Sequence, residues 1–257
     1  MTCYCPDQAL ANRARACLEA CAADLGLEGL KQLNLEALDQ DKDWVSISQQ
    51  GLPIVQAGAW QIYGSHDRPK ARAARYALNI DANTAFGTGH HETTFGAMLA
   101  YQRLNKKQCF ENLLDLGCGS GILALLALKA QSRKPRVLGT DIDAQAVERA
   151  KLNAKANACG YQNSGATRWV TAAGTRHLAV LSAAPYDLIF ANILAGPLYD
   201  LAPDIASIST QGTVVILAGF ILKQEQQLLA RYRSFGFIKE GRSQKGDWPV
   251  LTLRKKG

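Results

Sequence analysis

The clearest hydrophobic pattern in the chain is an apolar run that breaks into glycines and continues as a helix-forming segment. Residues 113–116 are a compact apolar run, interrupted only by Asp115, of the kind that forms a buried strand, and residues 122–130 are rich in Leu and Ala. Between these runs glycine occupies every second position: Gly117, Gly119 and Gly121. The pattern predicts a strand, a sharp turn and a helix, because glycine allows backbone conformations that a Cβ would hinder.

The alternation of strand and helix patterns continues to the C-terminus. Residues 137–141 form a second apolar run, and residues 144–158 an amphipathic helix pattern. Further strands are predicted at residues 167–170, 186–191, 212–217, 237–240 and 250–254, and further helices at residues 95–104 and 223–235. We therefore expect an α/β fold with a seven-stranded, Rossmann-like sheet. It should be parallel with an antiparallel C-terminal strand, because no helix pattern separates the last two strands.

The N-terminal third of the chain has a different pattern of apolar and polar residues. Residues 7–38 are Ala- and Leu-rich with helical spacing, whereas residues 41–80 contain short alternating segments, such as residues 60–63, that are typical of strands and turns. We expect three parts. They are a short helical segment over residues 1–40, a linker with short strands over residues 41–80, and the α/β domain over residues 81–257.

Composition and charge give no sign of a nucleic-acid-binding, membrane or metal-binding protein. The chain has 257 residues, 29 Lys and Arg against 22 Asp and Glu, and a net charge of +7, but its basic residues are scattered rather than gathered in a stripe. We expect that no direct nucleic-acid contact is required, and we expect no membrane segment or signal peptide. Seven irregularly spaced cysteines favour reduced thiols in the cytoplasm, and no zinc-site spacing appears, so no metal is expected.

The acidic residue that follows the glycines suggests a ligand. Asp141 ends the second predicted strand about twenty residues after the glycines, the interval at which a carboxylate reaches the two hydroxyls of a ribose. The glycine spacing is G-x-G-x-G, not the G-x-G-x-x-G of dinucleotide enzymes, which disfavours a nicotinamide-dependent oxidoreductase. Together with Asp115, the pattern resembles the first two motifs of class I S-adenosylmethionine (SAM) methyltransferases. The alternative interpretation of Asp141 is an exposed turn acid or a helix cap.

Asn192 ends the fourth strand of the predicted sheet and is the candidate catalytic residue. The first, second and fourth strands should end beside one another, which brings its amide near the glycines. Methyl transfer from a sulfonium needs an amine lone pair aligned with the methyl carbon, and an amide oxygen that accepts amine N–H groups supplies that alignment. The apolar Ile193 and Leu194 favour a neutral amine. Alternatively, Asn192 caps the helix that Pro197 opens. Cys118 is interpreted as a small buried filler.

Four motifs carry a closer resemblance. They are residues 86–94 (FGTGHHETT), 115–123 (DLGCGSGIL), 139–143 (GTDID) and 191–198 (ANILAGPL). With them, the chain from about residue 41 onward resembles the ribosomal protein L11 methyltransferase family. The resemblance implies SAM as the cofactor and methylation of lysine and α-amino nitrogens of a large-subunit ribosomal protein. It also implies a set of cofactor-binding residues: Phe86, Gly87, Thr88, Gly89, Thr94, Asp115, Gly117, Gly119, Gly121, Asp141, Ile142 and Asn192.

The N-terminus departs from this family. Its members usually carry a compact α/β substrate-recognition domain ahead of the linker, whereas here only about forty residues precede Lys42. Three alternatives for the activity therefore stay open. They are a lysine methyltransferase of another protein such as electron-transfer flavoprotein, a SAM-binding module without turnover, and a nucleic-acid methyltransferase. The last is disfavoured because Ile193 and Leu194 follow the amide, where that class usually has Pro and an aromatic residue for base stacking.

Overall fold

The computed structural model of the chain describes residues 12–17, 54–65, 76–81, 92–133, 135–159 and 167–257. Contacts divide the chain into two units, Met1–Trp44 and Val45–Gly257. In the first unit the described residues 12–17 are helical. The rest of the helix predicted over residues 7–38 lies outside the described residues, as does the segment around Lys42. In the described part of the chain, no helix combines the length and apolarity that crossing a membrane requires.

The second unit is built on a seven-stranded sheet with the order β6-β5-β4-β7-β8-β10-β9. The strands are β4 (Asn112–Leu116), β5 (Arg136–Asp141), β6 (Thr167–Thr171), β7 (Tyr186–Asn192), β8 (Ser209–Ala218), β9 (Phe237–Lys245) and β10 (Trp248–Lys255). β10 lies between β8 and β9 and is antiparallel to both, while β4 to β8 pair in parallel. The predicted parallel sheet with an antiparallel C-terminal strand is confirmed.

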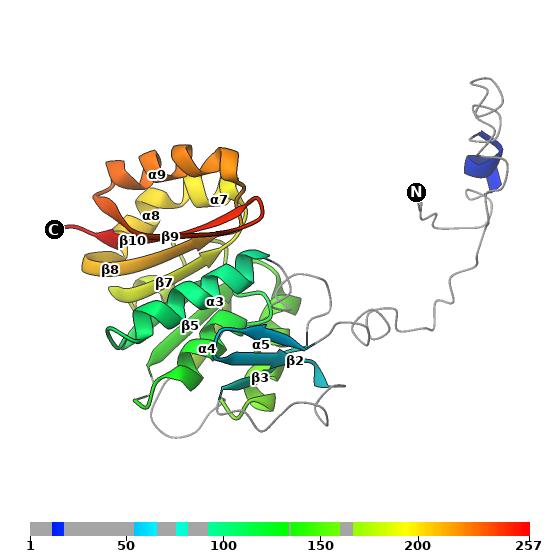
Figure 1. The fold of residues 1–257 in the computed structure, drawn as a ribbon, viewed down its shortest axis with the longest axis horizontal. Coiled ribbons are helices and arrows are strands. Elements are labelled where there is room, and N and C mark those ends of the chain that lie inside the picture. Colours follow the sequence, from blue (N-terminus) through cyan, green and yellow to red (C-terminus); the bar gives the residue numbers. More distant parts are fainter. Residues whose placement is uncertain (1–11, 18–53, 66–75, 82–91, 134, 160–166) are drawn as a thin grey trace. The chain divides into compact units, whose positions relative to one another are not determined.

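Helices cover both faces of this sheet, as Figure 1 shows, with α7, α8 and α9 on one side and α3 and α4 on the other. The helices are α3 (Glu92–Asn105), α4 (Ile122–Ala130), α5 (Ala144–Ala156), α6 (Leu178–Leu181), α7 (Ala195–Asp200), α8 (Ala202–Ser207) and α9 (Glu225–Ser234). All residues of β4 are buried because both of its faces are covered. A strand buried on both faces has no polar side, which explains its nearly continuous apolar run.

A small second sheet packs on the face that carries α3 and α4. It consists of β1 (Val55–Ala57), β2 (Trp60–Tyr63) and β3 (Ala77–Asn79), with β1 antiparallel and β3 parallel to β2. The buried side chains of this sheet, such as Trp60 and Leu78, join the core formed by α3 and α4. The strand predicted at residues 60–63 is therefore confirmed as β2.

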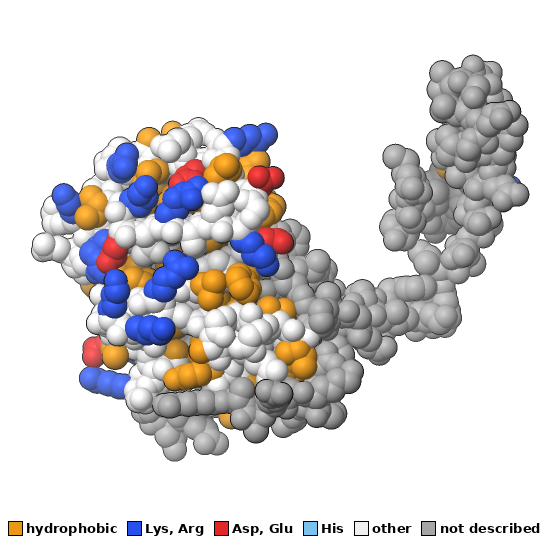
Figure 2. Space-filling view, viewed as in Figure 1, with side chains coloured by type: hydrophobic (Ala, Val, Ile, Leu, Met, Phe, Trp, Pro, Cys, Tyr) orange, Lys and Arg blue, Asp and Glu red, His pale blue; other side chains and the backbone are white. Residues whose placement is uncertain are grey.

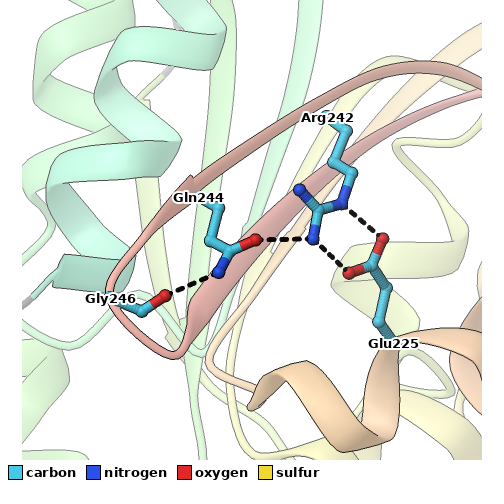
Figure 3. Close-up of polar contacts among 4 residues, drawn as sticks. All are labelled: Glu225, Arg242, Gln244 and Gly246. Carbon is cyan, nitrogen blue, oxygen red and sulfur yellow. Dashed lines mark hydrogen bonds and ion pairs between the residues drawn. The ribbon is translucent and has the colours of Figure 1, made fainter.

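The end of the β9–β10 hairpin is fastened to the start of α9. The guanidinium of Arg242 donates to both carboxylate oxygens of the buried Glu225, at 2.7 and 2.8 Å, and to Gln244 Oε1 at 2.7 Å. Gln244 Nε2 in turn donates to the Gly246 carbonyl at the turn (Figure 3). β9 extends to Lys245, beyond the predicted strand at residues 237–240, because it pairs with β10 as far as Lys245 and Trp248.

The helix predicted over residues 223–235 begins differently from the expectation. Leu222–Gln224 form a 3-10 turn, and α9 itself starts at Glu225. Gln224 Oε1 accepts from the Ile221 N–H at 2.9 Å, and the Leu222 N–H donates to the Asp247 carbonyl at 3.0 Å. The 3-10 turn is thus hydrogen-bonded to the β9–β10 hairpin. A local hydrophobic pattern does not reveal such a tertiary contact.

Candidate active site

The glycine-rich loop after β4 needs glycine at three positions for different reasons. Gly117, Gly119 and Gly121 have positive φ angles of 70°, 52° and 79°, which side chains rarely adopt. A Cβ on Gly117 would lie 2.2 Å from Ile193 Cγ2, and one on Gly121 would lie 2.8 Å from the Trp169 ring. A Cβ on Gly119 would meet nothing within 4 Å. Gly119 is therefore the glycine whose open side can admit a close ligand.

Hydrogen bonds hold this loop against the end of β5. The Cys118 N–H donates to the Thr140 carbonyl at 2.8 Å, and the Gly119 N–H donates to Asp141 Oδ2 at 2.9 Å. Asp141 Oδ1 accepts from the Asp143 N–H at 3.0 Å, so both carboxylate oxygens are oriented. Each oxygen has a second lone pair, so the carboxylate can still accept from two ligand hydroxyls. The N-cap of α5 is Asp143, not Asp141, so the capping alternative for Asp141 is wrong.

Asp115 lies beneath the loop and is almost fully buried, with 1% of its surface exposed. Its Oδ2 accepts from the Ala124 N–H in the first turn of α4, at 3.0 Å. Burial raises the pKa of Asp115 to about 7, the Ala124 hydrogen bond opposes the rise, and the charge of Asp141 adds to it. Cys118 is buried as well, and burial raises the pKa of its thiol, as expected for an inert filler.

Asn192, at the end of β7, has an oriented side-chain amide. Its Nδ2 donates to Thr94 Oγ1 at 3.0 Å, and Thr94 is buried in the first turn of α3. Because the N–H side of the amide faces Thr94, Oδ1 is the acceptor that remains for a ligand. The N-cap of α7 is Leu194, and no side chain caps that helix, so the capping alternative for Asn192 is wrong.

The loop after Asn192 is held mainly by packing. Its Ile193 side chain fills the space beside Gly117, and its backbone lies against Gly219, where a Cβ would come within 2.3 Å of the Ile193 carbonyl oxygen. Gly219 has a φ of 90° and follows β8. Sequence reasoning missed this residue, although a glycine two residues after the strand predicted at residues 212–217 was the available signal. Leu194 is exposed, at 68%.

The structure brings most of the predicted site residues to one edge of the sheet. β5, β4 and β7 are neighbours, so their carboxyl ends carry Asp141, the glycine-rich loop and Asn192 side by side. Ile142 is 76% exposed next to Asp141 and offers an apolar surface there. Thr94 reaches the same edge from α3. The predicted residues Phe86, Gly87, Thr88 and Gly89 lie outside the described residues.

Comparisons with known proteins identify the family. The ribosomal protein L11 methyltransferase model matches residues 3–256. The chain belongs to this family. A ribosomal protein L11 methyltransferase of Caulobacter sp. (strain K31) is 38% identical over 296 residues, covering 99% of this chain and 100% of the relative. One of Chelativorans sp. (strain BNC1) is 37% identical over 251 residues, covering 96% and 81%.

A solved structure agrees with this assignment. The ribosomal protein L11 methylase of Lactobacillus delbrueckii subsp. bulgaricus is 26% identical, with a TM-score of 0.65 over 79% of this chain and 99% of that one. The fold is that of the class I methyltransferases, and the protein is a SAM-dependent protein methyltransferase. The alignment with the Caulobacter protein is longer than the 257-residue chain, so that relative contains residues that this chain lacks.

Proposed function

We propose that this protein transfers methyl groups from SAM to lysine and α-amino nitrogens of ribosomal protein L11. Relatives that bear this name at 37–38% identity support the substrate. The observation that carries the chemistry is the hydrogen bond from Asn192 Nδ2 to Thr94, which leaves the amide oxygen as an acceptor at the carboxyl edge of the sheet. Electron-transfer flavoprotein, the alternative substrate, finds no support among these relatives.

The cofactor assignment rests on how well the described residues suit a nucleoside with a positively charged sulfur. The open side of Gly119 leaves room where a Cβ would stand. The Asp141 carboxylate keeps acceptor capacity for two ribose hydroxyls, and the exposed Ile142 offers an apolar contact to a base. The Phe86–Gly89 segment is proposed to bind the cofactor by its family motif.

When bound, SAM supplies a methyl group on a sulfonium, so transfer requires an amine nitrogen in line with that methyl carbon. Asn192 Oδ1 would accept an N–H of the incoming amine and so fix the direction of its lone pair. The apolar residues Ile193 and Leu194 follow Asn192 in the chain, and apolar groups near the incoming amine would disfavour its protonated form. Positioning and desolvation then replace a strong general base.

Recognition of the protein substrate is assigned to the N-terminal region. Residues 1–40 would act as a reduced recognition segment and residues 41–80 as the linker that joins it to the catalytic domain, residues 81–257. The substrate is a ribosomal protein and the thiols are expected to stay reduced, so we place the activity in the cytoplasm. Direct contact with nucleic acid is not required for this reaction.

The test is methyl transfer from isotopically labelled SAM to purified, unmethylated L11, followed by intact-mass spectrometry. A stepwise gain of methyl masses on L11 is the expected result. A cell extract labelled in parallel provides the comparison. If the extract shows a methylated protein other than L11 and purified L11 gains no mass, the substrate assignment is wrong while the methyltransferase chemistry stands. If SAM binds and no protein is labelled, the chain is a binding module.

A further inference from the structure

A buried asparagine on α5 links the glycine-rich loop to the residue that follows β3 and Ile80. Asn153 is 2% exposed, and its Nδ2 donates to the Ser120 carbonyl and to the Asp81 carbonyl, both at 2.9 Å. Its Oδ1 accepts from the Asp81 N–H at 3.0 Å. All three hydrogen bonds go to backbone groups on other elements, so this side chain fixes the course of two separate backbone segments.

The first segment is the glycine-rich loop. Ser120 stands between Gly119, whose side is open, and Gly121, which packs on Trp169. The orientation of the peptide group that follows Ser120 sets the direction in which the loop enters α4. A loop with three residues at positive φ has little local preference for one conformation, so an external hydrogen bond has large influence on it.

The second segment is the exit from β3. Asp81 follows β3 and Ile80, and its carboxylate accepts from the Ser65 N–H at 2.8 Å and the Ser65 hydroxyl at 2.6 Å. Asn153 thus hydrogen-bonds to the backbone of Asp81, whose carboxylate is already bonded to Ser65 just after β2. In the sequence, Asp81 directly precedes residues 82–91, which contain the predicted cofactor-binding residues Phe86–Gly89.

We propose that Asn153 is a positioning residue for cofactor binding. Its hydrogen bonds fix the position of the glycine-rich loop relative to the end of β3. This inference rests on the proposed SAM site and names a residue that contacts neither the cofactor nor the reacting atoms. Its effect passes through the Ser120 carbonyl to Gly119. Without the side chain, the loop loses one of the hydrogen bonds that hold it to other elements, keeps those from Cys118 to Thr140 and from Gly119 to Asp141, and samples conformations that bind SAM less tightly.

Asn157, one helical turn later, provides a matched control. It is 6% exposed and buried by the same small sheet. Its Oδ1 accepts from the Asn79 N–H at 2.9 Å, and its Nδ2 donates to the Asn79 carbonyl at 2.6 Å and the Asn153 carbonyl at 2.8 Å. Its side chain therefore hydrogen-bonds to the backbone of β3, as the side chain of Asn153 does to the backbone of Asp81. None of these three hydrogen bonds reaches the glycine-rich loop.

The experiment compares Asn153→Ala with Asn157→Ala in the full chain. Calorimetric titration with SAM and with S-adenosylhomocysteine gives the dissociation constants, and thermal unfolding without ligand gives the stability of each variant. We expect both variants to unfold at lower temperature. Asn153→Ala should weaken SAM binding at least tenfold, and Asn157→Ala less than threefold. In steady-state kinetics, the KM for SAM should rise in Asn153→Ala while kcat at saturating SAM changes less than threefold.

If Asn153→Ala does not fold, Asn153→Leu replaces it, with Asn157→Leu as its control. Leucine has about the size of asparagine, but it donates nothing to the Ser120 carbonyl. The same tenfold and threefold limits apply. Equal losses of SAM affinity in the two members of a pair would overturn the positioning role. A wild-type protein that binds no SAM would instead overturn the proposed function, and this inference with it.

Discussion

The carboxyl ends of β4 and β5 and those of β7 and β8 are neighbours in one sheet, yet they are built in different ways. After β4 and β5, hydrogen bonds from backbone N–H groups fix the chain: Cys118 to Thr140, Gly119 to Asp141, and Ala124 to Asp115. After β7 and β8, Ile193 is wedged between Gly117 and Gly219, and the large apolar side chains Leu194 and Leu222 are exposed.

This difference suits two kinds of ligand. A hydrogen-bonded loop presents fixed groups to a cofactor that is the same in every turnover, so pre-organisation improves its binding. Apolar side chains around one oriented amide suit a protein substrate, which brings its own backbone and side chains to the surface. Elsewhere, Lys and Arg side chains on the face in Figure 2 are dispersed among apolar and neutral ones, which gives no single charged track.

Asp115→Asn should have the largest effect, on stability in the hydrogen-bonded region. With a pKa of about 7 in the folded protein, Asp115 holds a proton that the unfolded chain has already released above about pH 4. Its stabilising contribution is therefore present at low pH and lost as the pH rises through 7. At about 1.4 kcal/mol per pKa unit, wild type should lose up to about 4 kcal/mol relative to the variant.

Urea unfolding of both proteins at intervals from about pH 4 to about pH 8 measures this loss. The Asn side chain keeps an oxygen for the Ala124 N–H, so this hydrogen bond is preserved. A difference between the two proteins that does not change with pH would show that Asp115 ionises normally in its buried position.

Asn192→Ala should have the next largest effect, on catalysis. Loss of the amide oxygen should lower kcat about 100-fold, because small errors in amine alignment cost this much. The SAM dissociation constant should stay within about threefold, since the cofactor side is held by other groups. Single-turnover methylation of L11 and SAM titration measure the two quantities.

Thr94 provides the control for this prediction. Thr94→Val removes the oxygen that receives the Asn192 amide and should lower kcat about tenfold, whereas Thr94→Ser keeps that oxygen and should restore it. Unchanged turnover in both Asn192→Ala and Thr94→Val would remove Asn192 from the mechanism.

Gly117→Ala and Gly119→Ala separate packing from ligand access. The first adds a Cβ that lies 2.2 Å from Ile193 and keeps a φ of 70°, so it should lower the unfolding free energy by about 2–3 kcal/mol. The second places its Cβ in open space and should cost about 1 kcal/mol, yet weaken SAM binding about tenfold. Equal stability losses, with unchanged SAM affinity in Gly119→Ala, would place the ligand elsewhere.

The sequence is most informative where a local pattern coincides with the tertiary environment. The run at residues 122–130 predicts α4 with its observed bounds, Ile122–Ala130, because an apolar helix after glycines has few other solutions. The placement of Asp141 and Asn192 at one edge of the sheet was also predictable, since parallel strands end at one edge.

Features that depend on distant partners could not be predicted in this way. Gly219 requires glycine because the Ile193 backbone approaches it; its place after a predicted strand marks a turn, but the local sequence does not identify Ile193 as the contact. Asn153 looks like a polar position in an amphipathic helix until Ser120 and Asp81 are placed beside it. The 3-10 turn at Leu222–Gln224 likewise depends on the Asp247 carbonyl. Each of these contacts joins segments that only the folded sheet brings together.

Leu194→Ser should have the smallest effect and bears on the packed region alone. Leu194 is 68% exposed and is the N-cap of α7, where a serine hydroxyl can accept from a free backbone N–H, so its replacement should leave the unfolding free energy unchanged or raise it by up to about 1 kcal/mol. If it contacts the protein substrate, the KM for L11 should rise about fivefold, close to 1 kcal/mol, with no change in SAM affinity. Leu178→Ser is the matched control, because Leu178 is 77% exposed on α6, which follows the edge strand β6. An equal rise of the KM for L11 in both variants would mean that L11 binding depends on exposed apolar side chains in general and not on the sheet edge beside Asn192.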